Sequence, residues 1–137
     1  GAVSPAGARG LMQLMPATAR GVAAAIRVRY DRSRLTEDIA YNVRLGTSHL
    51  ADLLEVFDGS YVLSVAAYNA GEARVRSWMR AHGDPRGRRV NVIDWIERIP
   101  IDETRNYVQR VLENLQVYRA VLAGGEAQAT IVADLNR

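Results

Sequence analysis

Three short stretches of the 137-residue sequence place polar side chains between glycines and apolar residues. The first stretch, residues 4–19 (SPAGARGLMQLMPATA), sets Gln13 between Met12 and Met15. Glycine lets the backbone approach a ligand closely. A glutamine carboxamide both donates and accepts hydrogen bonds, which suits the hydroxyl and acetamido groups of a sugar. The two methionines either form an adaptable apolar wall beside this amide or belong to the hydrophobic core.

The second and third stretches are residues 66–71 (AAYNAG) and 99–108 (IPIDETRNYV). A phenol and an amide at a helix end, Tyr68 and Asn69, suit hydrogen bonding to a buried carboxyl group or a sugar. The alternative is a capped helix end with the tyrosine in the core. Glu103 either faces a cleft and binds an ammonium or amide group, or stabilises the first turn of a helix.

The elements that position these stretches are helices almost throughout, which predicts an all-α fold. Proline at position 16 suits a first helical turn, Thr36 and Asp102 suit N-caps, and Gly71 suits a C-terminal cap. Helices are expected at residues 17–29, 36–57, 61–68, 72–82, 92–98 and 103–123. The last twelve residues carry weak signals, and we expect them to be partly ordered.

Composition narrows the functions further. Apolar residues make up 48% of the chain, enough for the core of one compact domain, and eighteen basic residues, all arginine, against fifteen acidic ones give a net charge of +3. This balance permits attraction to acidic polymers, but no basic run is interleaved with aromatic residues, so no nucleic acid is expected. The lack of cysteine excludes disulfides and thiol nucleophiles. His49 and His82 lie far apart without ligand spacing, so no metal or cofactor is expected.

In order and spacing, the three stretches resemble the catalytic domain of soluble lytic murein transglycosylases. That family shows a Glu-Ser dipeptide, then Ser-Pro-x-Gly-Ala-x-Gly-Leu-Met-Gln, Ala-Tyr-Asn-Ala-Gly and Ile-Pro-x-x-Glu-Thr-Arg-x-Tyr-Val. The last three are present almost letter for letter, and residues 42–50 also resemble the family's middle helix. The resemblance implies a lysozyme-like helical domain with a glycan-binding groove. We expect residues 1–125 to form this domain without its catalytic-glutamate segment, and residues 126–137 to form a tail.

The resemblance also implies an activity, cleavage of the bond between N-acetylmuramic acid and N-acetylglucosamine in peptidoglycan. The family leaves a 1,6-anhydro ring instead of adding water. One glutamate acts as general acid and then as base, which requires a pKa raised by apolar surroundings. The usual second carboxylate of glycosidases is not needed.

The family's Glu-Ser pair would fall a few residues before Gly1. The acidic residues Glu37, Glu55 and Glu72 do not match it, whereas Glu103 matches a ligand-binding position. We therefore expect the 137 residues alone to be inactive and their parent protein to be an enzyme. No signal peptide and no membrane-spanning stretch is present in the sequence, so we expect a piece of an exported protein of the periplasm or cell envelope.

The resemblance assigns roles to matching positions. Ser4 orients the glutamate, and Tyr68 forms a hydrogen bond near it. Gln13 and Met15 line the groove beside the scissile bond, and Asn69 holds the groove wall. Two further substrate-binding positions lie on the last long helix: Glu103 contacts the sugar or stem peptide, and Tyr107 flanks that site.

The expected partners are peptidoglycan glycan strands and stem peptides, bound by a monomer. Two other functions stay open: a non-catalytic peptidoglycan-binding module and a hydrolytic lysozyme on the same fold. A purely structural helical bundle explains none of the three stretches.

Overall fold

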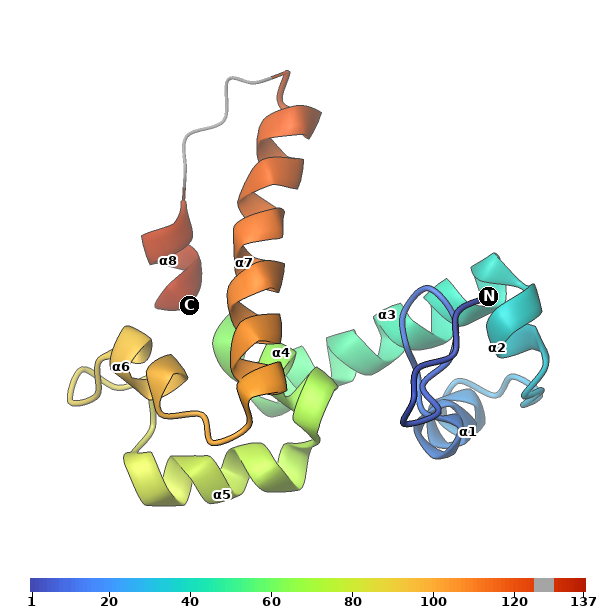
Figure 1. Ribbon diagram of the computed structural model, residues 1–137, viewed down its shortest axis with the longest axis horizontal. Helices are drawn as coiled ribbons and strands as arrows, with labels where there is room; N and C mark the ends of the chain where they lie inside the picture. The colour runs from blue at the N-terminus through green and yellow to red at the C-terminus, as the bar shows by residue number, and fades with distance from the viewer. Residues whose placement is uncertain (125–129) are drawn as a thin grey trace. The chain divides into compact units, whose positions relative to one another are not determined.

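The computed structural model describes residues 1–124 and 130–137 (Figure 1), and these residues form helices without any strand. The all-α prediction is therefore confirmed. The helices are α1 Pro16–Ala25, α2 Arg34–Glu37, α3 Ile39–Val56, α4 Tyr61–Ala70, α5 Glu72–His82, α6 Val92–Glu97, α7 Asp102–Leu122 and α8 Ile131–Leu135. The chain divides into two compact units, Gly1–Asp52 and Leu53–Arg137. No helix among the described residues is long and apolar enough to cross a membrane.

The first unit begins with an ordered loop of fifteen residues. Arg9 forms isolated antiparallel bridges with Val3 on one side and Leu14 on the other. Helix α1 follows with Pro16 in its first turn, as the sequence predicts. It ends four residues earlier than predicted, because Arg27 adopts a φ of +58° and reverses the chain.

The predicted helix over residues 36–57 is interrupted, and the predicted N-cap at Thr36 is wrong. Thr36 lies inside the short helix α2, and its hydroxyl donates to the Ser33 carbonyl. Asp38 has the extended backbone that a cap requires, and its carboxylate accepts from the Tyr41 N–H at 3.0 Å. Helix α3 therefore starts at Ile39, just after an aspartate that satisfies one of its free N–H groups.

The second unit packs its helices around α4, of which residues 62–67 are buried without a break. Helix α4 packs against α5, α7 and α8. Ser60 caps its N-terminus by accepting from the Leu63 N–H at 3.3 Å. Gly71, at a φ of +94°, ends it as predicted. Trp95 of α6 and Val108 of α7 complete a single apolar core in this unit.

Helix α7 begins one residue earlier than predicted, and the predicted N-cap at Asp102 is wrong. Ile101 is the extended residue before the helix, so Asp102 is already helical and forms no side-chain cap. Its carboxylate instead pairs with Arg105 in the next turn. The described part of the predicted tail forms α8, which packs against α7. The predicted boundary between residues 125 and 126 lies outside the described residues.

Candidate functional site

The Gly10–Met15 loop of the first unit is held by one buried side chain, that of Asn42 on α3. Asn42 is 1% exposed. Its amide nitrogen donates to the carbonyls of Arg9 (3.0 Å) and Leu35 (3.1 Å), and its oxygen accepts from the Met12 N–H (2.7 Å). One side chain thus ties the loop to both α2 and α3 through three hydrogen bonds, which fixes the loop backbone.

Two glycines permit this close seating. A Cβ added at Gly10 would lie 2.1 Å from the Leu35 carbonyl oxygen, and the residue has a φ of +74°. A Cβ added at Gly46, one turn after Asn42, would lie 2.5 Å from the Met12 Cβ. Glycine is required at both positions because no larger residue fits without moving the loop. Met12 is therefore held against α3, which agrees with the core alternative for that methionine.

Gln13 is presented at the exposed tip of this loop in a left-handed conformation, with a φ of +50°. Its side-chain nitrogen donates to the Gly10 carbonyl at 2.8 Å, which holds the carboxamide against the loop. Gln13 lines a pocket of about 480 Å³ together with the strongly exposed Leu11 and Ile39. The predicted ligand-binding amide therefore borders a hollow with apolar walls in the first unit.

The other two predicted residues of this unit are Ser4, six residues before Gly10, and Met15, the last residue of the loop. The Ser4 hydroxyl accepts from the Ala8 N–H at 3.0 Å and closes a tight turn with a left-handed Gly7. A hydroxyl that accepts in this way still has its hydrogen to donate. Met15 precedes α1 and is 43% exposed. Its side chain is thus on the surface, which is against the core alternative for that residue.

In the second unit the predicted residues from two distant stretches meet where α4 packs on α7. The Thr104 hydroxyl, 1% exposed, donates to the Asn69 side-chain oxygen at 2.7 Å. Tyr68 and Tyr107 lie close enough to interact electrostatically. Ala66 and Ala67 of α4 are buried and have small side chains, and α4 packs against α7 and α5. Their burial is consistent with the close packing predicted for the small residues of α4.

Both tyrosines are half-buried, and burial sets their acidity. Burial raises the pKa of Tyr68 well above its usual value, and the nearby Tyr107 adds to this effect. Burial also raises the pKa of Tyr107, while the charge of Arg110 opposes the change. Both phenols therefore stay protonated at neutral pH and keep an O–H hydrogen.

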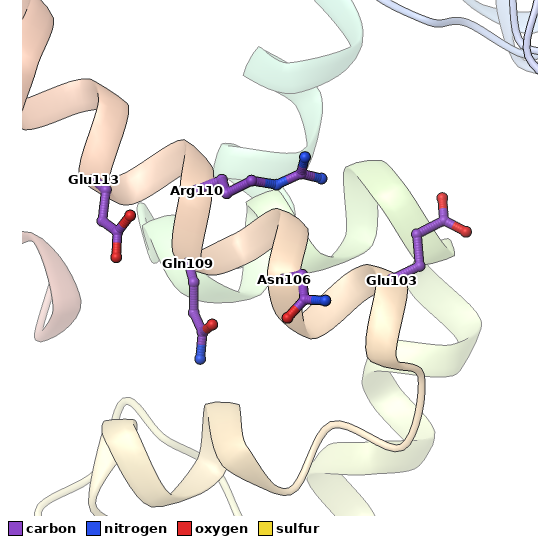
Figure 2. A pocket seen from close by; sticks show the side chains of 5 residues that line it. All are labelled: Glu103, Asn106, Gln109, Arg110 and Glu113. Carbon is purple, nitrogen blue, oxygen red and sulfur yellow. The ribbon is translucent and has the colours of Figure 1, made fainter.

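Glu103 is exposed on the first turn of α7, where it lines a pocket of about 430 Å³ (Figure 2). The other side chains that line this pocket also come from α7: Asn106, Gln109, Arg110 and Glu113. Figure 2 shows the carboxylate of Glu103 pointing away from the helix. Its place in the first helical turn fits the helix-dipole alternative as well.

Nothing in the described residues forms a metal site, since they contain no group of three or more potential ligands. His49 is half-buried, and burial lowers its pKa while the nearby Asp52 opposes this change. The imidazole is therefore mainly neutral at neutral pH.

The structure brings the predicted residues into two groups: Ser4, Gln13 and Met15 in the first unit, and Tyr68, Asn69, Glu103 and Tyr107 in the second. Sequence reasoning gave no role to Asn42 or Thr104, which position these groups. The available signal for Asn42 was its spacing of four residues from Gly46 on one face of a helix. Thr104 belongs to the third motif, but the motif does not show its role, because its partner lies 35 residues away.

The comparisons with known proteins identify the family of this chain. The model of the Transglycosylase SLT domain matches residues 1–91, so the chain belongs to that family. It is 39% identical over 117 residues to the soluble lytic murein transglycosylase of Escherichia coli K12, covering 85% of this chain and 18% of that protein. It is 33% identical over 111 residues to the membrane-bound lytic murein transglycosylase D of the same strain, covering 81% of this chain and 23% of that one.

Solved structures are similar as well. An inactive glutamate-to-glutamine mutant of the lytic transglycosylase Slt from Pseudomonas aeruginosa matches with a TM-score of 0.78 and 38% identity, over 92% of this chain and 20% of that one. The 70-kDa soluble lytic transglycosylase in complex with bulgecin A matches with a TM-score of 0.78 and 34% identity, over 88% and 19%. The lysozyme-like helical fold predicted for the chain is thereby confirmed. The chain spans about a fifth of the length of the relatives it matches.

Proposed function

We propose that the 137 residues form most of the substrate groove of a peptidoglycan lytic transglycosylase, which cleaves the bond between N-acetylmuramic acid and N-acetylglucosamine without water. The observation that carries the proposal is the rigid presentation of Gln13 at a pocket, on a loop that Asn42 fixes with three hydrogen bonds. Such fixed geometry suits a group that must hold a sugar in one orientation. Membership of the transglycosylase family supports the same function.

The reaction needs one acid–base group. A protonated glutamate donates its proton to the glycosidic oxygen, so that the bond from the muramic C1 to that oxygen breaks. The same carboxylate then takes the proton of the muramic C6 hydroxyl, and the C6 oxygen bonds to C1 to close the 1,6-anhydro ring. We assign this role to a glutamate that precedes Gly1 in the parent protein. The inactive glutamate-to-glutamine mutant of the Pseudomonas relative supports an essential glutamate in this family.

Three residues of the first unit would act around this glutamate. Ser4 retains a hydroxyl hydrogen and would donate it to the carboxylate, which would keep the side chain in one orientation. The Gln13 nitrogen is bound to the loop, so the side-chain oxygen would accept from a sugar hydroxyl or amide. Met15 would supply an apolar wall, since its side chain is exposed beside the loop.

Four residues of the second unit would also bind substrate or support the reaction. Tyr68 would donate its phenolic hydrogen near the glutamate, because burial keeps that phenol protonated. The Asn69 side-chain oxygen accepts from the Thr104 hydroxyl, which fixes the orientation of the amide. The amide hydrogens of Asn69 would then donate to a sugar. Glu103 would bind the sugar or the stem peptide at the exposed start of α7, and Tyr107 would flank it.

We further propose that residues 1–125 are the groove-forming part of the catalytic domain and that residues 126–137 are a tail. The parent protein would be a monomer acting on glycan strands and stem peptides in the periplasm or cell envelope. The murein-directed names of the relatives support this location and substrate.

The test uses the 137-residue chain, the parent protein and a parent variant with the preceding glutamate changed to glutamine, each mixed with purified sacculi. Only the parent should release soluble muropeptides. Release by the 137-residue chain, or undiminished release by the glutamine variant, would contradict the assignment of the acid. Binding of sacculi without release by the parent would indicate the non-catalytic binding module instead.

A further inference from the structure

A stripe of charged and polar side chains runs along the exposed face of α7. Glu103, Asn106, Arg110 and Glu113 follow one another at spacings of three and four residues, which places them on one side of the helix. All four line the pocket of about 430 Å³ described above (Figure 2). The stripe therefore carries both signs of charge within one hollow.

Arg110 is the positively charged residue of this stripe. Within the described part of the chain, its guanidinium forms no hydrogen bond or ion pair. Neighbouring polar groups are paired, since Asp102 binds Arg105 and Gln109 donates to Glu97 at 3.1 Å. Figure 2 shows the guanidinium extending toward the Glu103 end of the helix and away from Glu113. The spacing of three residues would allow Arg110 to form an ion pair with Glu113, but the arginine side chain points away from it.

Arg110 is also a neighbour of Tyr107. Tyr107 lies one turn earlier on α7, and the guanidinium charge acts on its phenol. Tyr107 in turn interacts with Tyr68 of α4. Arg110 therefore borders the residues proposed to bind the glycan, at the side where Glu103 also lies.

We propose that Arg110 binds a carboxylate of peptidoglycan and extends the substrate site along α7. A guanidinium offers two parallel N–H donors that match the two oxygens of a carboxylate. Glu103 lies seven residues earlier, roughly 10 Å along the helix axis, so the pair would receive a segment that carries a carboxylate at one end and an amine or amide at the other. The lactyl group of a peptide-free muramic acid and the stem peptide are the two sources of such a carboxylate. The inference rests on the proposed function.

The test measures binding of four ligands to the 137-residue chain by calorimetry: a neutral N-acetylglucosamine tetramer, a peptide-free disaccharide, a disaccharide with its stem peptide, and the same compound with its carboxylates amidated. The variants are Arg110→Ala and Arg110→Lys. The matched control is Arg74→Ala, which removes an exposed arginine from α5. Thermal melts check that all three variants fold like the unchanged 137-residue chain.

Arg110→Ala should weaken binding of the carboxylate-bearing ligand roughly tenfold, and Arg110→Lys should weaken it less. Neither change should affect the neutral tetramer, and Arg74→Ala should affect no ligand. The ligand that loses affinity, peptide-free or peptide-bearing, identifies the source of the carboxylate.

Two results would overturn the inference alone. One is an equal effect of Arg110→Ala and Arg74→Ala on every ligand; the other is an effect of Arg110→Ala on the neutral tetramer and the amidated ligand as large as on the carboxylate-bearing ligands. If the unchanged chain bound none of the four ligands, the proposed function would fail together with the inference.

Discussion

Replacing Asn42 by alanine should release the loop that carries Gln13. The change removes three hydrogen bonds from a side chain that is 1% exposed. The Arg9 carbonyl keeps a partner in the Leu14 N–H, whereas the Met12 N–H and the Leu35 carbonyl lose the bond that Asn42 gave them. At about 1 kcal/mol for each bond, the loop should lose about 3 kcal/mol of stability.

This loss should be measured in two ways. Urea unfolding followed by circular dichroism reports the free energy of unfolding of the whole chain. Hydrogen exchange of the Leu14 amide reports opening of the loop alone, because its bond to the Arg9 carbonyl is not touched by the substitution. A loss of about 3 kcal/mol corresponds to exchange roughly a hundredfold faster.

Asn114→Ala is the control, since it removes the same side chain from an exposed position of α7. It should change the free energy of unfolding by less than about 0.5 kcal/mol. The account of the loop would be refuted if Asn42→Ala behaved like this control in both measurements.

Three further changes test other contacts. Gly10→Ala should cost about 2 kcal/mol more than Gly7→Ala in urea unfolding, because both glycines have positive φ but only at Gly10 would the new Cβ meet backbone, at 2.1 Å. Thr104→Val should cost about 1–2 kcal/mol by leaving the Asn69 oxygen without its 2.7 Å donor, and Thr104→Ser should restore most of it. Hydrogen bonding from Arg119 lowers the pKa of the Asp134 carboxyl below 3.8 in the folded chain. The ion pair between Arg119 and Asp134 therefore stabilises the folded chain fully above the unfolded pKa of 3.8, and this stabilisation is lost as pH falls through the lower folded pKa. In Asp134→Asn, the helicity of α8 should consequently depend less on pH over this range.

The sequence predicted most of the secondary structure because its strongest signals are local. A proline at position 16 and a glycine at 71 each act on their own backbone, and both helix ends are found where expected. The N-caps at Thr36 and Asp102 failed for the opposite reason. Several acceptors compete near each helix start, and the backbone conformation of the residue before the helix decides among them.

The site was predictable in part. The motif around Tyr68 and Asn69 and the motif that begins α7 were both identified from the sequence, and they meet at one helix contact in the structure. The spacing of Asn42 from Gly46 indicates only a shared helix face; its hydrogen bonds were not predictable, since they go to loop and helix backbone atoms up to 33 residues away. The unpaired state of Arg110 was not predictable either, because the sequence does not show which of the eighteen arginines form ion pairs.

The chemistry of the released product tests the central proposal most directly. The parent protein, with its glutamate, is incubated with sacculi in water enriched in heavy oxygen, and the muropeptides are analysed by mass spectrometry. The account predicts 1,6-anhydro-muramic ends that are one water lighter than hydrolysis products and contain no label. Muramic reducing ends that carry the heavy oxygen would show hydrolysis and contradict it.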